Sequence, residues 1–387
     1  MSENNYYNII DFGSSKIRFS VFDNKLKEKF SESKITIFNN DNLSYFSEIK
    51  NIVKKAEKEI SSHIEDIILI LDSKRLLNIN ISLFKNIDYK SSIIKLYDTL
   101  ILELRQLIYS HYQSYEIVHT IVDKYIIDDI EYSKLPIKKK EVSNIKIDFK
   151  LICFPKKNID ELKTNFSKIN LNIISFYCSS FVKSSSYIKK LNLNKISFLE
   201  IGYERTSLLI YDYNKIKFIQ TVPIGSSHIT KDISKIFKIT YNDAEKIKKS
   251  FNKSETEFSY TGKSNNNDIS VKDIINKKIS IDLLKKVILY RVQEIIDLHF
   301  KLSSIKNYNI NLKETDLFLI GEGSILFDNN SFYLDNKFEF KSINYLSETD
   351  SQICLSGIAQ YLSEYEKPKI NIKNKGLFEK FFFYFSK

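Results

Sequence analysis

The stretch Tyr7–Phe22, YNIIDFGSSKIRFSVF, decides the fold. Its two apolar runs, Tyr7–Ile10 and Ile17–Phe22, are typical of strands, and small residues dominate the segment between them. This pattern predicts a hairpin whose loop offers backbone N–H groups, hydroxyls and one ammonium to a phosphate, although an ordinary β-turn is the alternative. Asp11, which begins the loop, is suited to hold water around a phosphate-bound Mg²⁺. The predicted phosphate ligands are Gly13, Ser14, Ser15 and Lys16.

Similar patterns recur along the chain in a fixed order. A second pair of strand-like runs, Ile196–Leu199 and Leu208–Tyr211, flanks another short loop. Residues 241–249 then have the charge spacing of a helix start. A third apolar run, Leu317–Ile320, ends in the glycine-bearing turn GEGS at residues 321–324. Two hairpins, a helix and a strand with such a turn are together more specific than any one of them.

Bulk properties set limits on the class of protein. A chain of 387 residues exceeds one ordinary core, so two lobes are expected. The hydrophobic content of 43% and charged content of 28% are typical of a folded protein. Its three cysteines are scattered, which fits a reducing compartment without disulfides, and no Cys or His spacing predicts a metal site. The polar N-terminus and short apolar runs predict neither export nor a membrane span.

The net charge of +11 indicates an anionic partner. Nucleic acid is not expected, because no recognisable nucleic-acid module is present. The lysines are dispersed, apart from the short run Lys138–Lys140 and the C-terminal tail, and a solvated basic surface accounts for most of this charge. An anionic membrane surface and an acidic protein are the partners that this reasoning leaves.

The order of elements resembles the superfamily of actin, the heat-shock chaperone ATPases and the sugar kinases, and within it the FtsA family of bacterial cell-division proteins. Residues 11–17, DFGSSKI, are similar to the first phosphate motif, D-[IL]-G-[ST]-S-K-[IV]. Residues 222–233, VPIGSSHITKDI, resemble V-P-x-G-G-x-x-[IV]-T-x-D-I. Residues 243–248, DAEKIK, match D-A-E-x-I-K, and residues 319–324 stand where the adenosine motif belongs. The resemblance implies an α/β, actin-like ATPase fold with two lobes.

The resemblance also implies four subdomains and a C-terminal amphipathic helix. The expected segments are 1–82, 160–190 and 351–366 for subdomain 1A, 83–159 for 1C, 191–227 and 305–350 for 2A, 228–304 for 2B, and 367–387 for a basic linker and membrane-targeting helix. Within 1C, the periodicity predicts one long helix over Ile93–Gln113 and strands over Tyr115–Asp128 and Ile145–Phe154.

By this resemblance the cofactors are ATP and Mg²⁺. Besides the first hairpin, the implied nucleotide ligands are Glu200, Gly202, Arg205, Thr206, Glu245, Lys248, Gly321, Gly323 and Ser324. The implied function is to tether the ring of the tubulin-like protein FtsZ to the inner face of the cytoplasmic membrane at the division site. The implied partners are the acidic FtsZ tail, which 2B would bind through its lysines between Lys231 and Lys286, other divisome proteins, and further copies that form filaments through 1C and 2B.

Two departures bear on the nucleotide. The family's second hairpin reads D-x-G-G-G-T, whereas this chain has Tyr203, Glu204 and Arg205 after its first glycine. Glu322 replaces a glycine of the adenosine motif. Extra carboxylates oppose a polyanion, and the Arg205 guanidinium offsets one of them if it reaches a phosphate. We therefore expect weak ATP binding and at most weak ATPase activity, with no residue identified as a hydrolytic base.

The C-terminal segment, residues 376–387, reads GLFEKFFFYFSK and follows a basic linker. At 100° per residue its apolar side chains gather on one face, with Lys380 and Lys387 opposite. A helix of this length, about 16 Å, lies in the membrane interface and does not span it. A terminal helix packed on the protein body is the alternative. The predicted membrane-binding residues are Leu377, Phe378, Phe381, Phe382 and Phe385.

Two other functions fit the same superfamily. A sugar or acetate-type kinase would need a catalytic carboxylate and a substrate lobe, and it has no use for a lipid-binding tail. An adaptor similar to PilM of type IV pili shares the fold, and the amphipathic terminus argues against it. Co-pelleting with an FtsZ tail peptide would decide between the PilM-like adaptor and the FtsA-like function.

Overall fold

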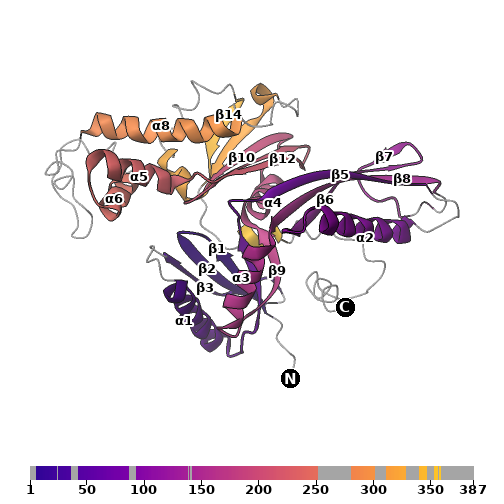
Figure 1. Cartoon of the computed structure of the whole chain (residues 1–387), viewed down its shortest axis with the longest axis horizontal. Coiled ribbons are helices and arrows are strands. Elements are labelled where there is room, and N and C mark those ends of the chain that lie inside the picture. Colours follow the sequence, from indigo (N-terminus) through magenta and orange to yellow (C-terminus); the bar gives the residue numbers. More distant parts are fainter. Residues whose placement is uncertain are drawn as a thin grey trace. The chain divides into compact units, whose positions relative to one another are not determined.

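The computed structural model describes residues 6–23, 25–35, 42–86, 93–137, 139, 142–251, 280–300, 311–327, 340–346, 353–355 and 357–358. The chain divides into two compact units (Figure 1). Unit 1 is Met1–Leu191 with Asp350–Lys387, and unit 2 is Asn192–Thr349. Within the part of the chain that the structure describes, no helix combines the length and hydropathy needed to cross a membrane.

The first sheet of unit 1 has the strand order β3-β2-β1-β4-β9. Three strands are antiparallel neighbours, namely β1 Tyr7–Phe12, β2 Lys16–Phe22 and β3 Glu28–Ile35. Two follow in parallel, β4 Asp66–Leu71 and β9 Asn172–Cys178. Strand β4, DIILIL, is an unbroken apolar run because a parallel strand inside a covered sheet is buried on both faces. The helices of this part are α1 Asn42–Ile60, α3 Lys156–Ser167 and α4 Ser179–Leu191.

An inserted sheet of unit 1 has the order β5-β8-β6-β7. Its elements are β5 Leu77–Asn86, α2 Ile93–His111, β6 Tyr115–Ile127, β7 Ile130–Tyr132 and β8 Asn144–Pro155. Helix α2 lies along this sheet (Figure 1). It buries one face, including Leu100 and Leu104, in a core with Phe149 and Leu151 of β8. The long helix and the strands predicted for this part are confirmed. The sheet begins at Leu77, whereas the expected 1C segment begins at residue 83.

The sheet of unit 2 has the order β12-β11-β10-β13-β14, which repeats the first sheet of unit 1. Its strands are β10 Lys195–Ile201, β11 Thr206–Asp212, β12 Lys215–Val222, β13 Asp316–Ile320 and β14 Ser342–Tyr345. Again three antiparallel strands are followed by two parallel ones. Its helical elements are α5 Ser226–Phe237, α6 Tyr241–Phe251, α8 Ile281–Phe300, η2 Leu312–Glu314 and η3 Glu322–Phe327.

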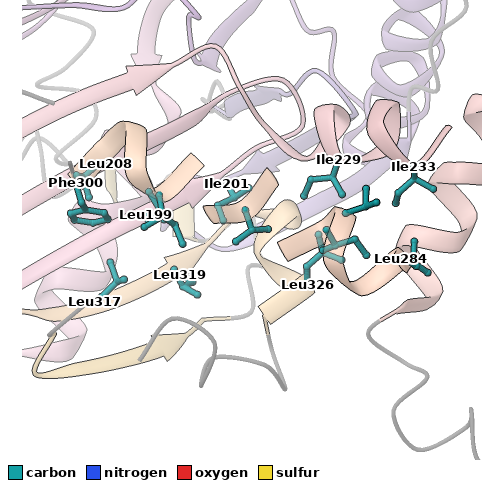
Figure 2. Packing of buried hydrophobic residues seen from close by; sticks show 14 of the residues in the cluster. Leu199, Ile201, Leu208, Ile229, Ile233, Leu284, Phe300, Leu317, Leu319 and Leu326 are labelled. Carbon is teal, nitrogen blue, oxygen red and sulfur yellow. The ribbon is translucent and has the colours of Figure 1, made fainter. Parts of the chain in front are cut away.

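The core of unit 2 joins this sheet to its helices. Leu199 and Leu319 come from the sheet, while Ile229, Ile233 and Leu284 come from α5 and α8 (Figure 2). A bidentate ion pair between the Arg291 guanidinium and the Asp232 carboxylate, at 2.6 and 3.0 Å, also joins α8 to α5. The ends of β10 and β13 are therefore held in a fixed relation to α5 and α6.

Candidate functional site

The first predicted loop is a tight two-residue turn between β1 and β2. The Gly13 N–H donates to the Lys16 carbonyl at 3.1 Å, which leaves Ser14 and Ser15 at the tip. A Cβ atom on Gly13 would lie 2.7 Å from that carbonyl oxygen, so glycine is required there. The Tyr45 hydroxyl of α1 donates to the Gly13 carbonyl at 2.7 Å. The loop is thus fixed, with its small residues together as predicted.

Asp11 lies beneath this loop between two cations that the sequence analysis missed. Its carboxylate is 3.0 Å from the Arg18 guanidinium and 3.5 Å from Lys183 Nζ, and Asp11 and Lys183 are buried. Arg18 is the register partner of Asp11 across the hairpin, so strand pairing predicts their contact. Lys183 comes from α4, where no motif marks it. With Lys16 at the end of the loop, three basic side chains gather around the first hairpin, a composition that suits an anionic ligand.

The second loop, between β10 and β11, has the same frame. The Gly202 N–H donates to the Arg205 carbonyl at 2.9 Å, which leaves Tyr203 and Glu204 at the tip. Counting along both hairpins, Glu200 corresponds to Asp11, Gly202 to Gly13, and Arg205 to Lys16. The repeated loop geometry supports the predicted pairing of the two motifs.

Arg205 is paired inside unit 2. Its Nη1 donates to the Glu200 carboxylate at 3.2 Å and to the Ser207 hydroxyl at 2.9 Å. Glu200 is only 2% exposed, so its negative charge would be costly without this partner. The guanidinium thus compensates Glu200, which is not one of the two extra carboxylates, Glu204 and Glu322, that Arg205 was expected to offset.

The second hairpin rests on the first turn of α5. The Ser226 and Ser227 N–H groups donate to the Gly202 and Tyr203 carbonyls at 2.9 and 2.7 Å. These donors belong to a helix start, where amides have no partner within the helix. A Cβ atom on Gly225 would lie 2.6 Å from both Arg205 N and the Gly202 oxygen. The helix start therefore binds the loop of its own unit.

Glu245 and Lys248 of α6 form a buried ion pair of 2.8 Å. Lys248 Nζ also donates to the Thr230 hydroxyl at 2.8 Å and to the Ser226 carbonyl at 3.1 Å. Burial lowers the pKa of Lys248, and the Glu245 charge opposes that shift. Burial likewise opposes ionisation of Glu245, but Lys248 and Thr230 outweigh it and hold its pKa below the usual value. The predicted nucleotide ligands of α6, Glu245 and Lys248, therefore lie together as an ion pair.

The glycine-bearing turn after β13 packs against the end of β10. Gly321 has φ of +89°, and a Cβ atom there would lie 2.8 Å from the Ile201 oxygen. A Cβ atom on Gly323 would lie 2.7 Å from the same oxygen. The Ser324 N–H donates to the Gly321 carbonyl at 3.0 Å, while Glu322 is exposed. Both predicted glycines are thus required by close packing, and this turn lies beside the second hairpin.

The predicted ligands form two clusters, one in each unit. The predicted membrane-binding residues and most of the segment expected to complete 1A, residues 351–366, lie outside the described residues. Lys138 and Lys140 of the short basic run also lie outside them. Among the side chains that the structure describes, no group of three or more His, Cys, Asp or Glu residues is placed to hold a metal ion.

Comparison with known proteins adds independent information. The model of the family Cell division protein FtsA matches residues 198–372. No curated protein matches the sequence. A structure of the PilM–PilN type IV pilus biogenesis complex matches with a TM-score of 0.60 and 11% identity over 93% of this chain and 99% of the other. Ethanolamine utilization protein EutJ from Carboxydothermus hydrogenoformans matches at 0.48 and 12%, over 92% and 90%. MreB 5 of Spiroplasma citri bound to AMPPNP matches at 0.47 and 11%, over 92% and 95%.

The repeated sheet is the main feature of the fold of this chain. Each unit carries three antiparallel strands followed by two parallel ones, and each begins with a two-residue hairpin. The likeness to the PilM–PilN structure concerns the fold alone, because the identity is low. The protein therefore has the actin-like ATPase fold and is similar to FtsA over residues 198–372.

Proposed function

We propose that this protein is an ATP-binding, actin-like adaptor of bacterial cell division that tethers FtsZ to the inner face of the cytoplasmic membrane. The observation that carries the proposal is the pair of matched hairpins, each closed on a glycine and each ending in a cation, Lys16 or Arg205. The family match over residues 198–372 supports the cell-division assignment.

The residues present in the first hairpin fit a magnesium nucleotide. Lys16 ends the loop, and Arg18 and Lys183 flank Asp11, so the hairpin would hold phosphates and Asp11 would order water around Mg²⁺. In unit 2, Arg205 and Lys248 are each balanced by a carboxylate. Glu245, Lys248 and the turn of Gly321 would hold the nucleoside. Bound ATP supplies a polyanion for such cations, and we assign no hydrolytic step to any residue.

The exposed surface of α5, α6 and α8 supports an acidic protein partner. Apolar side chains are exposed there, with Tyr290 at 74%, Ile236 at 49% and Leu283 at 44%. Exposed lysines accompany them, namely Lys231, Lys235, Lys246, Lys249 and Lys286. Charged and apolar groups in one region suit an acidic peptide with apolar anchors, such as the FtsZ tail. Membrane attachment is proposed from the sequence of residues 367–387, and filament formation through 1C and 2B from the family resemblance.

Flotation with anionic liposomes tests the proposal on the full chain. We expect the protein to float with the liposomes and to carry a fluorescent FtsZ tail peptide with it. The assay is run both with and without Mg-ATP. Neutral liposomes are the matched control, because lysines near anionic lipid add about 1 kcal/mol each. Flotation without the peptide would favour a PilM-like adaptor. Failure to float would contradict the membrane role.

A further inference from the structure

The loop of the second hairpin carries a large aromatic side chain that reaches α6. The Tyr203 hydroxyl is hydrogen-bonded to the hydroxyl of Tyr241, the first residue of α6. The Tyr203 ring centroid lies 5.7 Å from Lys248 Nζ, within the range of a cation–π contact. Tyr241 and Lys248 are two turns apart on α6, so one side chain of the loop touches this helix at two places.

The backbone of the same loop is held from below by α5. The Tyr203 carbonyl accepts from the Ser227 N–H at 2.7 Å, and the Gly202 carbonyl accepts from the Ser226 N–H at 2.9 Å. The tight approach of Gly225 leaves no room for the loop base to move toward α5. The base of the loop is therefore fixed by α5, and its tip is held through Tyr203.

The ammonium group beneath the Tyr203 ring belongs to Lys248, one of the predicted nucleotide ligands. Lys248 Nζ donates to three oxygens, those of Glu245, Thr230 and Ser226, and an ammonium group has three donors. Its remaining contact is the face of the Tyr203 ring. A nucleotide that binds Lys248 must replace one of these contacts. Moving the Tyr203 ring, which sits at the tip of a hairpin loop, costs less free energy than breaking the hydrogen bonds from Lys248 to α5.

We infer that Tyr203 and Tyr241 form a latch that holds the second hairpin over the Glu245–Lys248 pair, so that a nucleotide displaces the Tyr203 ring when it binds. The inference rests on the proposed nucleotide site. The latch makes nucleotide affinity depend on Tyr241, because the Tyr241 hydroxyl holds the loop closed through its hydrogen bond to Tyr203. Tyr241 is in this sense a positioning residue.

Removing one hydroxyl at a time tests the latch in the full chain. Tyr241→Phe keeps the ring and removes the bond, so titration with a fluorescent ATP analogue and Mg²⁺ should show affinity about fivefold tighter, which corresponds to about 1 kcal/mol. Tyr203→Phe should give the same gain, and the double variant no further gain, because either change removes the same bond. Tyr213→Phe is the control, since Tyr213 is exposed in the β11–β12 turn and should leave affinity unchanged.

Amide hydrogen exchange without nucleotide separates the latch from the nucleotide site. The N–H groups of Tyr203 and Glu204 lie at the loop tip that Tyr241 holds, so they should exchange several-fold faster in Tyr241→Phe than in Tyr213→Phe, whereas those of Gly202, Ser226 and Ser227 at the fixed base should not change. Unchanged exchange together with unchanged affinity would overturn the latch. Faster exchange in Tyr241→Phe with no ATP binding by any variant would support the latch and overturn the proposed nucleotide site.

Discussion

Within the two hairpin loops, the residues between the glycine and the cation set the difference between the units. Ser14 and Ser15 leave the first loop small, whereas Tyr203 and Glu204 give the second a ring and a carboxylate. Burial and the hydrogen bond to Tyr241 raise the pKa of Tyr203, so its hydroxyl stays protonated at neutral pH. We therefore expect Glu204 in the second loop to oppose phosphate binding, and the Tyr203 ring lies over Lys248.

Restoring small residues in the second loop should tighten ATP binding. The variant Tyr203→Gly with Glu204→Gly removes both obstacles, and we expect affinity to rise by roughly tenfold, about 1.4 kcal/mol, in a calorimetric titration. The matched control is Tyr213→Gly with Asn214→Gly, another two-residue turn of the same sheet, where both residues have positive φ that glycine accepts. Tight binding by the unmodified chain, unchanged by the restoration, would show that the two side chains are harmless.

How much of the site was predictable depends on the distance over which its contacts form. Each hairpin was predictable because alternating apolar runs and a glycine loop are local signals, and Arg18 follows from strand pairing with Asp11. Lys183 was not predictable, because α4 reaches Asp11 through tertiary packing between residues far apart in sequence. The contact of Tyr203 with α6 is missing from the sequence analysis for the same reason.

At the scale of the element, the C-terminal amphipathic segment should account for membrane binding. Deleting residues 376–387 should leave a folded protein that no longer floats with anionic liposomes. Retained flotation of the shortened chain would rule out the membrane helix.

A single charge on the apolar face of residues 376–387 should reduce flotation nearly as much as deleting the segment. Phe381→Glu replaces about 1.5–3 kcal/mol of apolar burial with a charge that must lose water. Phe383→Glu is the matched control, because Phe383 falls on the polar side of the helical projection and its loss should weaken flotation less. Equal loss from both variants would mean that the predicted face is wrong.

At the scale of the whole molecule, two buried histidines should make stability depend on pH. Burial lowers the pKa of His119 to about 3 in unit 1 and of His299 to about 4 in unit 2. The unfolded chain takes up these protons near pH 6.5, whereas the folded chain does not. Stability is therefore retained above that pH and lost as pH falls, by about 1.4 kcal/mol per pH unit for each histidine.

Urea denaturation between pH 7 and pH 4.5 measures this loss. His119→Gln keeps an acceptor for the Cys178 N–H, which donates to His119 Nε2 at 2.9 Å, but removes the titrating group. His119→Gln should make the free energy of unfolding of unit 1 depend less on pH. His63→Gln, at an exposed position, should leave that dependence unchanged. The same slope in His119→Gln and the unmodified chain would contradict the assignment.

The net charge of +11 should make binding of an acidic FtsZ tail sensitive to salt. Steering charges are screened beyond about 8 Å at physiological ionic strength, so affinity should fall steadily as salt rises. Replacing Lys231 and Lys286 by glutamine should reduce both the affinity and its salt dependence. Salt-insensitive binding, or crosslinks that map to residues 83–159, would contradict the assignment to 2B.

The two ends of the inserted segment, at Leu77 and near Cys153, lie next to each other. Leu77 at the start of β5 is the register partner of Cys153 near the end of β8, so the chain leaves and rejoins the first sheet of unit 1 at neighbouring positions. Such an insertion behaves as a cassette, because a short linker between residues 76 and 156 would preserve the connectivity of β4, α3 and β9. Its removal would also uncover Phe181 and Tyr177, against which the His119 ring packs. Grafting this cassette into a related scaffold therefore requires two chain ends at the same spacing. It also requires a buried apolar surface, like that of Tyr177 and Phe181, for the His119 imidazole to pack against.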